Sequence, residues 1–214
     1  MEIFDIEQGS PEWFAQRKGV MTCSHAQEIG NNGKGLETYI RNMMAEYYSR
    51  GEKTMFSNEH TERGHELEDQ AASIYAINSG QKISTIGFIK RSAHVGGSPD
   101  RLVDRLEIAE GQPSFSITKL SRGLLEVKCP DDVGFFKHLL DGEKAIDTKY
   151  VWQIQMQLLI TGAEWCDYLA YNPNYEQTTF IYRFYPDPVK FAALERGFII
   201  GEELIKTINK KLGK

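Results

Sequence analysis

Hydrophobic side chains recur along the chain with two periods, one typical of helices and one typical of strands. Apolar residues at 36, 39, 40, 43, 44 and 47 share one face of a helix expected over residues 36–50. The same period predicts helices over 61–78, 133–140, 150–161 and 188–211. Ser24 followed by Gln27 matches a capping box, which predicts that a further helix begins at Ser24.

Shorter runs rich in β-branched and aromatic residues predict strands over 82–90, 96–103, 124–128, 165–171 and 178–185. The stretch from 104 to 123 has no clear period, although residues 114–117 resemble a short extra strand. The central order is helix, three strands, helix, strand. This order predicts an α/β fold with a mixed sheet between helices.

Length and composition indicate one folded domain over residues 1–214. The chain is 41% hydrophobic and 26% charged, which excludes disorder and low complexity as its general character. Its net charge of −5 argues against a passive nucleic-acid coat, which would be basic. The same charge does not exclude an enzyme that gathers carboxylates around metal ions and keeps its basic groups local.

Cysteine usage favours a reducing compartment. Cys23, Cys129 and Cys166 are odd in number and widely spaced, so neither a disulfide framework nor a structural zinc site is expected. Residues 1–5 lack a basic segment followed by an apolar run, so no secretory signal is expected. No apolar stretch reaches about 18 residues, so we expect no membrane span and a cytoplasmic location.

Glu126 and Lys128 stand two apart on a predicted strand and therefore share one face. An isolated pair of this kind is usually an ordinary surface ion pair. Here, however, Asp100 follows Pro99, which removes a ladder donor and opens the strand beside its neighbour. Two carboxylates and a backbone carbonyl suit Mg²⁺ or Mn²⁺. With Lys128 beside them, they form a complete set for hydrolysing a phosphodiester.

Five sequence blocks, in order, resemble one known family. They are WFAQRKGVMTCS at 13–24, GHELE at 64–68, SPD at 98–100, LEVKCP at 125–130 and QIQ at 153–155. The blocks are similar to those of the phage recombination exonucleases typified by lambda exonuclease. That family belongs to the PD-(D/E)xK superfamily, so the resemblance implies a restriction-endonuclease-like core with a central mixed sheet flanked by helices.

The resemblance assigns roles at the metal site. It implies that Asp100 and Glu126 bind metal, that the Val127 carbonyl assists, and that Glu68 on a helix completes the cluster. It implies two Mg²⁺ ions, with Mn²⁺ as a substitute. Lys128 is implied to orient or activate the attacking water. Read without the family, Glu68 is equally an ordinary solvated helix residue.

The resemblance also implies residues that act on phosphate. Gln153 is implied to position water or phosphate, and Arg17 and Ser24 to bind the 5′-phosphate of a DNA end. A phosphate suits a helix N-terminus with free amides, and arginine binds it in a bidentate manner. Ser24 alone is equally explained as a simple helix cap.

The chain departs from the family pattern between the aspartate and the glutamate. An insert of approximately 104–122 separates them, and its Arg105, Lys119 and Arg122 are candidate DNA contacts. The resemblance further implies a homotrimeric ring with duplex DNA passing through its centre. A ring reconciles the acidic total with DNA binding, because basic groups can line one channel.

The expected function is that of a Mg²⁺-dependent 5′→3′ exonuclease. It would degrade one strand of linear duplex DNA to mononucleotides and leave a 3′ overhang for a single-strand-annealing recombination protein. The expected setting is phage or prophage recombination in a bacterial host. Two alternatives remain: a structure-specific endonuclease or nickase of the same superfamily, and a non-catalytic DNA-end-binding scaffold.

Overall fold

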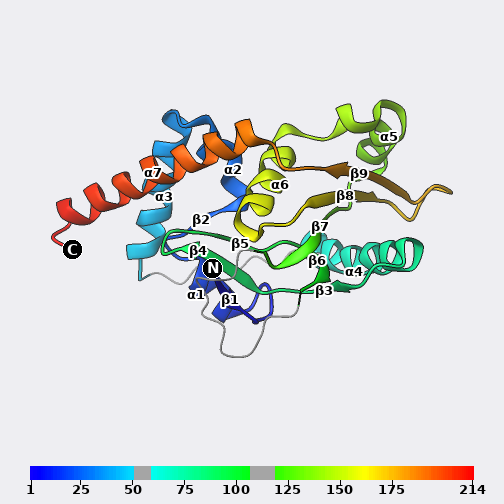
Figure 1. Cartoon of the computed structure of the whole chain (residues 1–214), viewed down its shortest axis with the longest axis horizontal. Helices are drawn as coiled ribbons and strands as arrows, with labels where there is room; N and C mark the ends of the chain where they lie inside the picture. Colours follow the sequence, from blue (N-terminus) through cyan, green and yellow to red (C-terminus); the bar gives the residue numbers. More distant parts are fainter. Residues whose placement is uncertain (51–58, 107–118) are drawn as a thin grey trace.

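The computed structural model describes residues 1–50, 59–106 and 119–214, with the backbone alone for 59–65. Two mixed sheets lie next to each other, with helices packed around them (Figure 1). The smaller sheet has the order β1-β4-β5-β2, formed by Glu2–Phe4, Phe88–Ser92, Val95–Gly97 and Met21–Thr22. The larger has the order β3-β6-β7-β8-β9, formed by Ile83–Ser84, Arg101–Arg105, Ser121–Lys128, Trp165–Tyr171 and Thr179–Phe184.

Helices divide between the two sheets. Near the smaller sheet lie α1, α2, α3 and α7, formed by Pro11–Arg17, Ala26–Asn31, Lys34–Tyr48 and Pro188–Lys211. Around the larger sheet lie α4, α5 and α6, formed by Glu59–Ser79, Asp132–Asp141 and Thr148–Thr161. Two 3₁₀ turns, η1 and η3, cover Cys23–His25 and Gly142–Ala145. No helix in the described ranges is long and apolar enough to cross a membrane.

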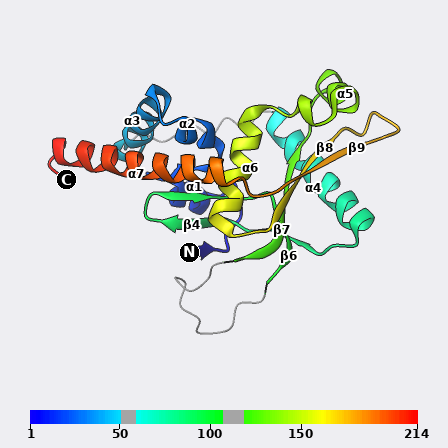
Figure 2. The same ribbon diagram turned by 45° about the horizontal axis from the view of Figure 1, so that its top comes forward.

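Strand β7 is central to the larger sheet and is sandwiched between α4 and α6 (Figure 2). Leu125 and Val127 pack with the α4 side, whereas Leu124 packs with the α6 side. Side chains alternate along a strand, so Glu126 also faces α6. The strand pairs antiparallel with β6 and parallel with β8. This position buries an acidic residue between a sheet and a helix.

The five helices predicted from the apolar period and the last two predicted strands are confirmed. The helix expected over 36–50 is α3, and those expected over 133–140, 150–161 and 188–211 are α5, α6 and α7. The strand expected over 165–171 is β8, with the same bounds. The mixed α/β fold is likewise confirmed, although with two sheets rather than one.

Two strands that the sequence predicts as continuous are each divided between the sheets. The segment 82–90 gives β3 to the larger sheet and β4 to the smaller, with the break before Phe88. At Gly87 a Cβ atom would lie 2.2 Å from the Ile6 carbonyl oxygen, so the chain crosses the N-terminal segment there. The segment 96–103 divides at Pro99 into β5 and β6. The prediction of single strands was wrong because the backbone of a distant segment sets the break.

The predicted helix start at Ser24 was also wrong. Residues 23–25 form the turn η1, and α2 begins at Ala26 without a side-chain cap. The Ser24 hydroxyl instead lies 3.1 Å from the Thr22 hydroxyl. Buried Cys23 fixes this turn, because it packs so closely against Gly97 that a Cβ atom there would lie 2.3 Å from its sulfur.

The insert lies between β6 and β7. Its described ends are paired, with Arg105 opposite Ser121. Lys119 forms an ion pair with Glu164. The short strand expected at 114–117 lies outside the described residues.

Candidate active site

The break at Pro99 delivers Asp100 to the end of β7. Asp100 directly precedes β6, whose Arg101 is opposite Leu125 of β7. The Val127 backbone N–H donates to Asp100 Oδ2 at 2.7 Å. A carboxylate is therefore fixed against the strand that carries Glu126, as the sequence predicts.

The Glu126 carboxylate is buried and accepts hydrogen bonds on both oxygens. Gln153 Nε2 on α6 donates to Oε1 at 2.5 Å, and Gln157 Nε2 donates to Oε2 at 2.7 Å. Lys128 Nζ also donates to Oε1. The structure thus brings the predicted Glu126, Lys128 and Gln153 into direct contact.

Lys128 Nζ lies between the two carboxylates. Besides contacting Glu126, it lies 4.0 Å from Asp100 Oδ2 and donates to the Val127 carbonyl at 3.1 Å. The ring of Tyr150 lies 5.1 Å from the same ammonium. The ammonium of one lysine therefore interacts with two carboxylates and one carbonyl oxygen.

Burial gives this cluster unusual proton affinities. Burial, and then the charge of Asp100, raise the pKa of Glu126 to about 7. Burial also raises the pKa of Asp100, with a further contribution from the charge of Glu68. For Lys128, burial lowers the pKa, but the charges of Glu126 and Asp100 outweigh it and the net pKa is raised. The site carries more buried negative than positive charge, so it favours an additional cation.

The donor atoms of the cluster fit a hard divalent cation. Asp100, Glu126 and the Val127 carbonyl supply oxygen ligands of the kind that Mg²⁺ and Mn²⁺ prefer. No group of three or more acidic, histidine or cysteine side chains converges as a metal cluster among the residues whose side chains are described. The cluster thus offers two carboxylates and one carbonyl rather than three carboxylates.

Glu68 is connected to this cluster through Arg101 and does not bond to Asp100 directly. Its Oε1 accepts from Arg101 Nη1 at 3.0 Å, and Arg101 also contacts Asp69. Arg101 Nη1 donates to the Asp100 carbonyl at 2.6 Å. Glu68 is close enough to influence Asp100 electrostatically, yet it faces an arginine; its metal role stays a prediction.

The N-terminal segment reaches the cluster through Trp13. The Arg17 guanidinium lies 4.1 Å from the centre of the Trp13 ring. Burial lowers the pKa of Arg17. Trp13 Nε1 donates to Ser98 Oγ at 2.9 Å, two residues before Asp100. Ser24 is exposed on the neighbouring turn. Both predicted phosphate ligands stay predictions, although Ser24 does not cap a helix.

Electrostatics also link the turn η1 to the cluster. Burial raises the pKa of Cys23, and the charge of Glu126 raises it further. The charge of Arg17 acts in the opposite direction. The charges of Arg17 and Glu126 therefore both act on the pKa of Cys23, which directly precedes Ser24.

Sequence reasoning missed Gln157 and assigned no role to Gln155. Gln155 Nε2 donates to the Tyr185 carbonyl at 2.9 Å, and its Oε1 accepts from the Asp187 N–H at 2.8 Å. It therefore turns away from Glu126. The spacing contained the signal, because residues four apart share a helix face and residues two apart do not. Gln153 and Gln157 satisfy that rule.

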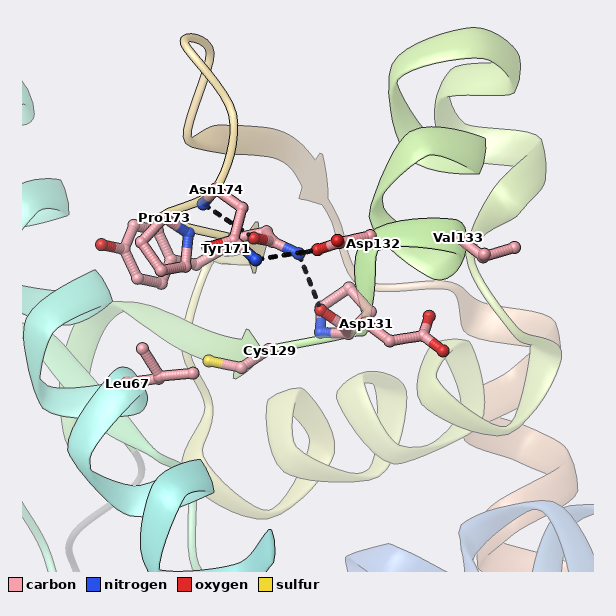
Figure 3. Close-up of a pocket in the computed structure, with 10 residues that line it drawn as sticks. Leu67, Cys129, Asp131, Asp132, Val133, Tyr171, Pro173 and Asn174 are labelled. Atoms are coloured by element: carbon pink, nitrogen blue, oxygen red, sulfur yellow. Dashed lines mark hydrogen bonds between the residues drawn. The ribbon is translucent and has the colours of Figure 1, made fainter.

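A hollow of about 500 Å³ lies beyond the end of β7 (Figure 3), and neither Asp100, Glu126 nor Lys128 is among the residues that line it. It lies between α4, the end of β7, the start of α5 and the connection from β8 to β9. Asn172 Nδ2 donates to Asp132 Oδ1 at 2.9 Å, and Asn174 Nδ2 donates to the same oxygen at 3.0 Å. Cys129, which directly follows Lys128, lines the hollow.

The chain is similar in structure to solved exonucleases. The alkaline exonuclease LHK-Exo of Laribacter hongkongensis is 24% identical, with 95% of this chain and 98% of that chain covered and a TM-score of 0.74. Its complex with dAMP is 25% identical over the same shares, with a TM-score of 0.75. A phage-related exonuclease from Haemophilus somnus 129PT is 14% identical, covering 90% and 96%, with a TM-score of 0.64. The chain therefore has the alkaline exonuclease fold.

Sequence comparisons agree with the structural ones. An uncharacterized protein, R354, of Acanthamoeba polyphaga mimivirus is 24% identical over 175 residues, which is 78% of this chain. The chain spans only 30% of the length of that relative. A YqaJ-like viral recombinase domain matches residues 12–164, which include every residue of the cluster described above. Because this match covers more than half of the chain, the chain belongs to the family of YqaJ-like viral recombinase domains.

Proposed function

We propose that this chain is a metal-dependent nuclease that digests one strand of linear duplex DNA in the 5′→3′ direction. The observation that carries the proposal is the buried cluster of Asp100, Glu126 and Lys128 at the end of β7. A buried lysine shared by two carboxylates with raised pKa values is costly to fold. Such a cluster is typical of a functional site rather than a structural one.

Each side chain of the cluster has a role in phosphodiester hydrolysis. Asp100, Glu126 and the Val127 carbonyl would hold Mg²⁺ or Mn²⁺, and Glu68 would support them. The bound metal, with two ions expected, supplies Lewis-acid stabilisation of the charge that develops on the phosphate. Lys128 orients the attacking water and can hold or release a proton at Nζ. Gln153, which donates to Glu126, positions that carboxylate and the water.

The proposed polarity rests on Arg17 and Ser24. The Arg17 guanidinium is held against Trp13, and Trp13 in turn bonds to the segment that carries Asp100. A 5′-phosphate bound by Arg17 would therefore lie at a fixed position relative to the cluster. The dAMP complex of LHK-Exo supports a mononucleotide product.

The proposal also includes an assembly and a partner. A homotrimeric ring would enclose the duplex, and the 3′ overhang would pass to a single-strand-annealing protein. The membership of a viral recombinase family supports this setting, in a phage or prophage within a bacterial cell.

The test is digestion of one linear duplex, labelled on either strand, beside a closed circle. We expect Mg²⁺-dependent loss of the 5′-phosphorylated strand, release of mononucleotides and an intact circle. Asp100→Asn should abolish the release. A cut circle would instead support an endonuclease, and end binding without cleavage would support a scaffold.

A further inference from the structure

Gln157 is the buried amide that the catalytic motif does not account for. It lies one turn after Gln153 on α6 and is fully buried. Its Nε2 donates to Glu126 Oε2 at 2.7 Å, whereas Gln153 donates to the other oxygen, Oε1. The two amides therefore hold the carboxylate from both sides.

The other end of the Gln157 amide makes no hydrogen bond with the described residues. The oxygen at this end, Oε1, is buried. A buried acceptor without a donor costs stability. Gln155, two residues earlier, differs because both ends of its amide bond to backbone groups before α7. The amide of Gln155 stabilises the connection to α7, whereas the side-chain hydrogen bond of Gln157 holds Glu126.

We propose that Gln157 is a positioning residue that fixes the rotation of the Glu126 carboxylate for binding a divalent cation. The inference rests on the proposed function. Glu126 Oε1 faces Lys128 and Gln153, so a carboxylate free to rotate would exchange its two oxygens. The bond from Gln157 to Oε2 prevents that exchange. Outer hydrogen-bond partners of this kind typically change metal affinity by about 10–100-fold when they are removed.

The test measures binding of Mn²⁺ to the full chain without DNA by isothermal titration calorimetry. Gln157→Met keeps the length of the side chain and removes the hydrogen-bond donor. Gln157→Asn keeps an amide, but its shorter side chain moves the donor away from Glu126 Oε2. We expect both variants to bind Mn²⁺ about tenfold more weakly, or worse. Gln155→Met is the matched control: its melting temperature should fall while its Mn²⁺ affinity stays that of the unmodified chain.

The outcomes separate this inference from the proposed function. Mn²⁺ binding that is lost in Asp100→Asn, yet is unchanged in both Gln157 variants, would overturn the positioning role and leave the nuclease proposal standing. Mn²⁺ binding that Asp100→Asn does not alter would overturn both. If Gln157→Met does not fold, Gln157→Asn decides the question. A purely structural role predicts a lower melting temperature without weaker binding, which would also overturn the proposal.

Discussion

At the scale of single residues, Lys128 sets the charge balance of the site. Its ammonium contacts Glu126 and lies near Asp100, and these two carboxylates raise its pKa despite burial. It therefore stays protonated at neutral pH unless a bound cation displaces it. Exposed Lys149 offers a comparison, because it lies 4.8 Å from the same Tyr150 ring but pairs with Asp147 at the surface.

Replacing Lys128 by methionine should abolish digestion of duplex DNA and leave end binding intact. General acid–base groups contribute about 10²- to 10⁴-fold, so we expect a loss of at least that order in the single-turnover rate. Lys149→Met should retain the original rate. Equal losses in the two variants would show that the effect comes from general charge and not from the site.

Glu126 makes the metal-free protein less stable as the pH rises. Its pKa is about 7 in the folded chain, against an ordinary value of 4.5, so the folded state binds the proton more tightly. The stability that Glu126 contributes through this tighter proton binding is fully present below about pH 4.5 and is lost as the pH rises through 7. A shift of this size corresponds to at most about 3–4 kcal/mol.

Glu126→Gln should therefore gain stability relative to the unmodified chain between pH 5 and pH 8. Urea unfolding in the presence of a chelator, at several pH values, measures the difference. The charges of Asp100 and Glu126 act on each other, so the comparison measures how the loss of Glu126 changes the titration of the carboxylate pair. A difference that does not change with pH would contradict the raised pKa.

At the scale of elements, two contacts between distant segments hold the site together. Trp13 on α1 donates to Ser98 Oγ and also to the Gly87 carbonyl at 3.1 Å, so α1 is fixed to both strand breaks. On the opposite face of the larger sheet, Asp167 of β8 accepts two bonds from Arg183 of β9 and one from Tyr75 of α4. These bonds fix α4, which carries Glu68.

Trp13→Phe should reduce the preference for 5′-phosphorylated ends several-fold. Phenylalanine keeps a ring beside Arg17 but removes the N–H that bonds to Ser98. The measurement is the ratio of digestion rates on phosphorylated and hydroxyl ends. Trp165→Phe, a buried change on the α4 side, should lower stability without altering that ratio. An unchanged ratio for Trp13→Phe would show that the bond from Trp13 to Ser98 has no part in recognising the DNA end.

Tyr75→Phe should destabilise the protein by about 1–2 kcal/mol, because Asp167 loses a buried hydrogen bond at 2.7 Å. Chemical denaturation measures this change. Tyr47→Phe, at a side chain that is 49% exposed, should change stability by less than about 0.5 kcal/mol. Similar small changes for both would mean that the bond does not hold α4 in place.

At the scale of the whole molecule, charge and assembly have to be considered together. The chain carries a net charge of −5, which repels DNA unless basic groups concentrate on one surface. The proposed ring would satisfy that condition by directing its basic groups into a channel. The ring is part of the proposed function.

Native mass spectrometry of the purified chain should show three copies in one assembly. Digestion of a long duplex in the presence of excess unlabelled competitor should then proceed without release, because a closed ring stays on its substrate. A monomer that digests DNA would contradict the ring while leaving the active site unaffected.

The sequence by itself determined the features that depend on local geometry. Alternation along a strand placed Glu126 and Lys128 on one face, and helical spacing identified α3 and α6. Proline at 99 indicated the opening that delivers Asp100. These properties follow from backbone periods and from a missing N–H, and both belong to the residues concerned.

Only the tertiary structure decided which segments meet. Close contact of Gly87 with the N-terminal segment divided one predicted strand between two sheets, and the packing of Cys23 replaced the expected cap at Ser24 by a turn. The partners of Glu68 and Gln157 likewise came from distant elements. The physical reason is that a hydrogen bond or a steric contact across the fold depends on residues that no local pattern contains.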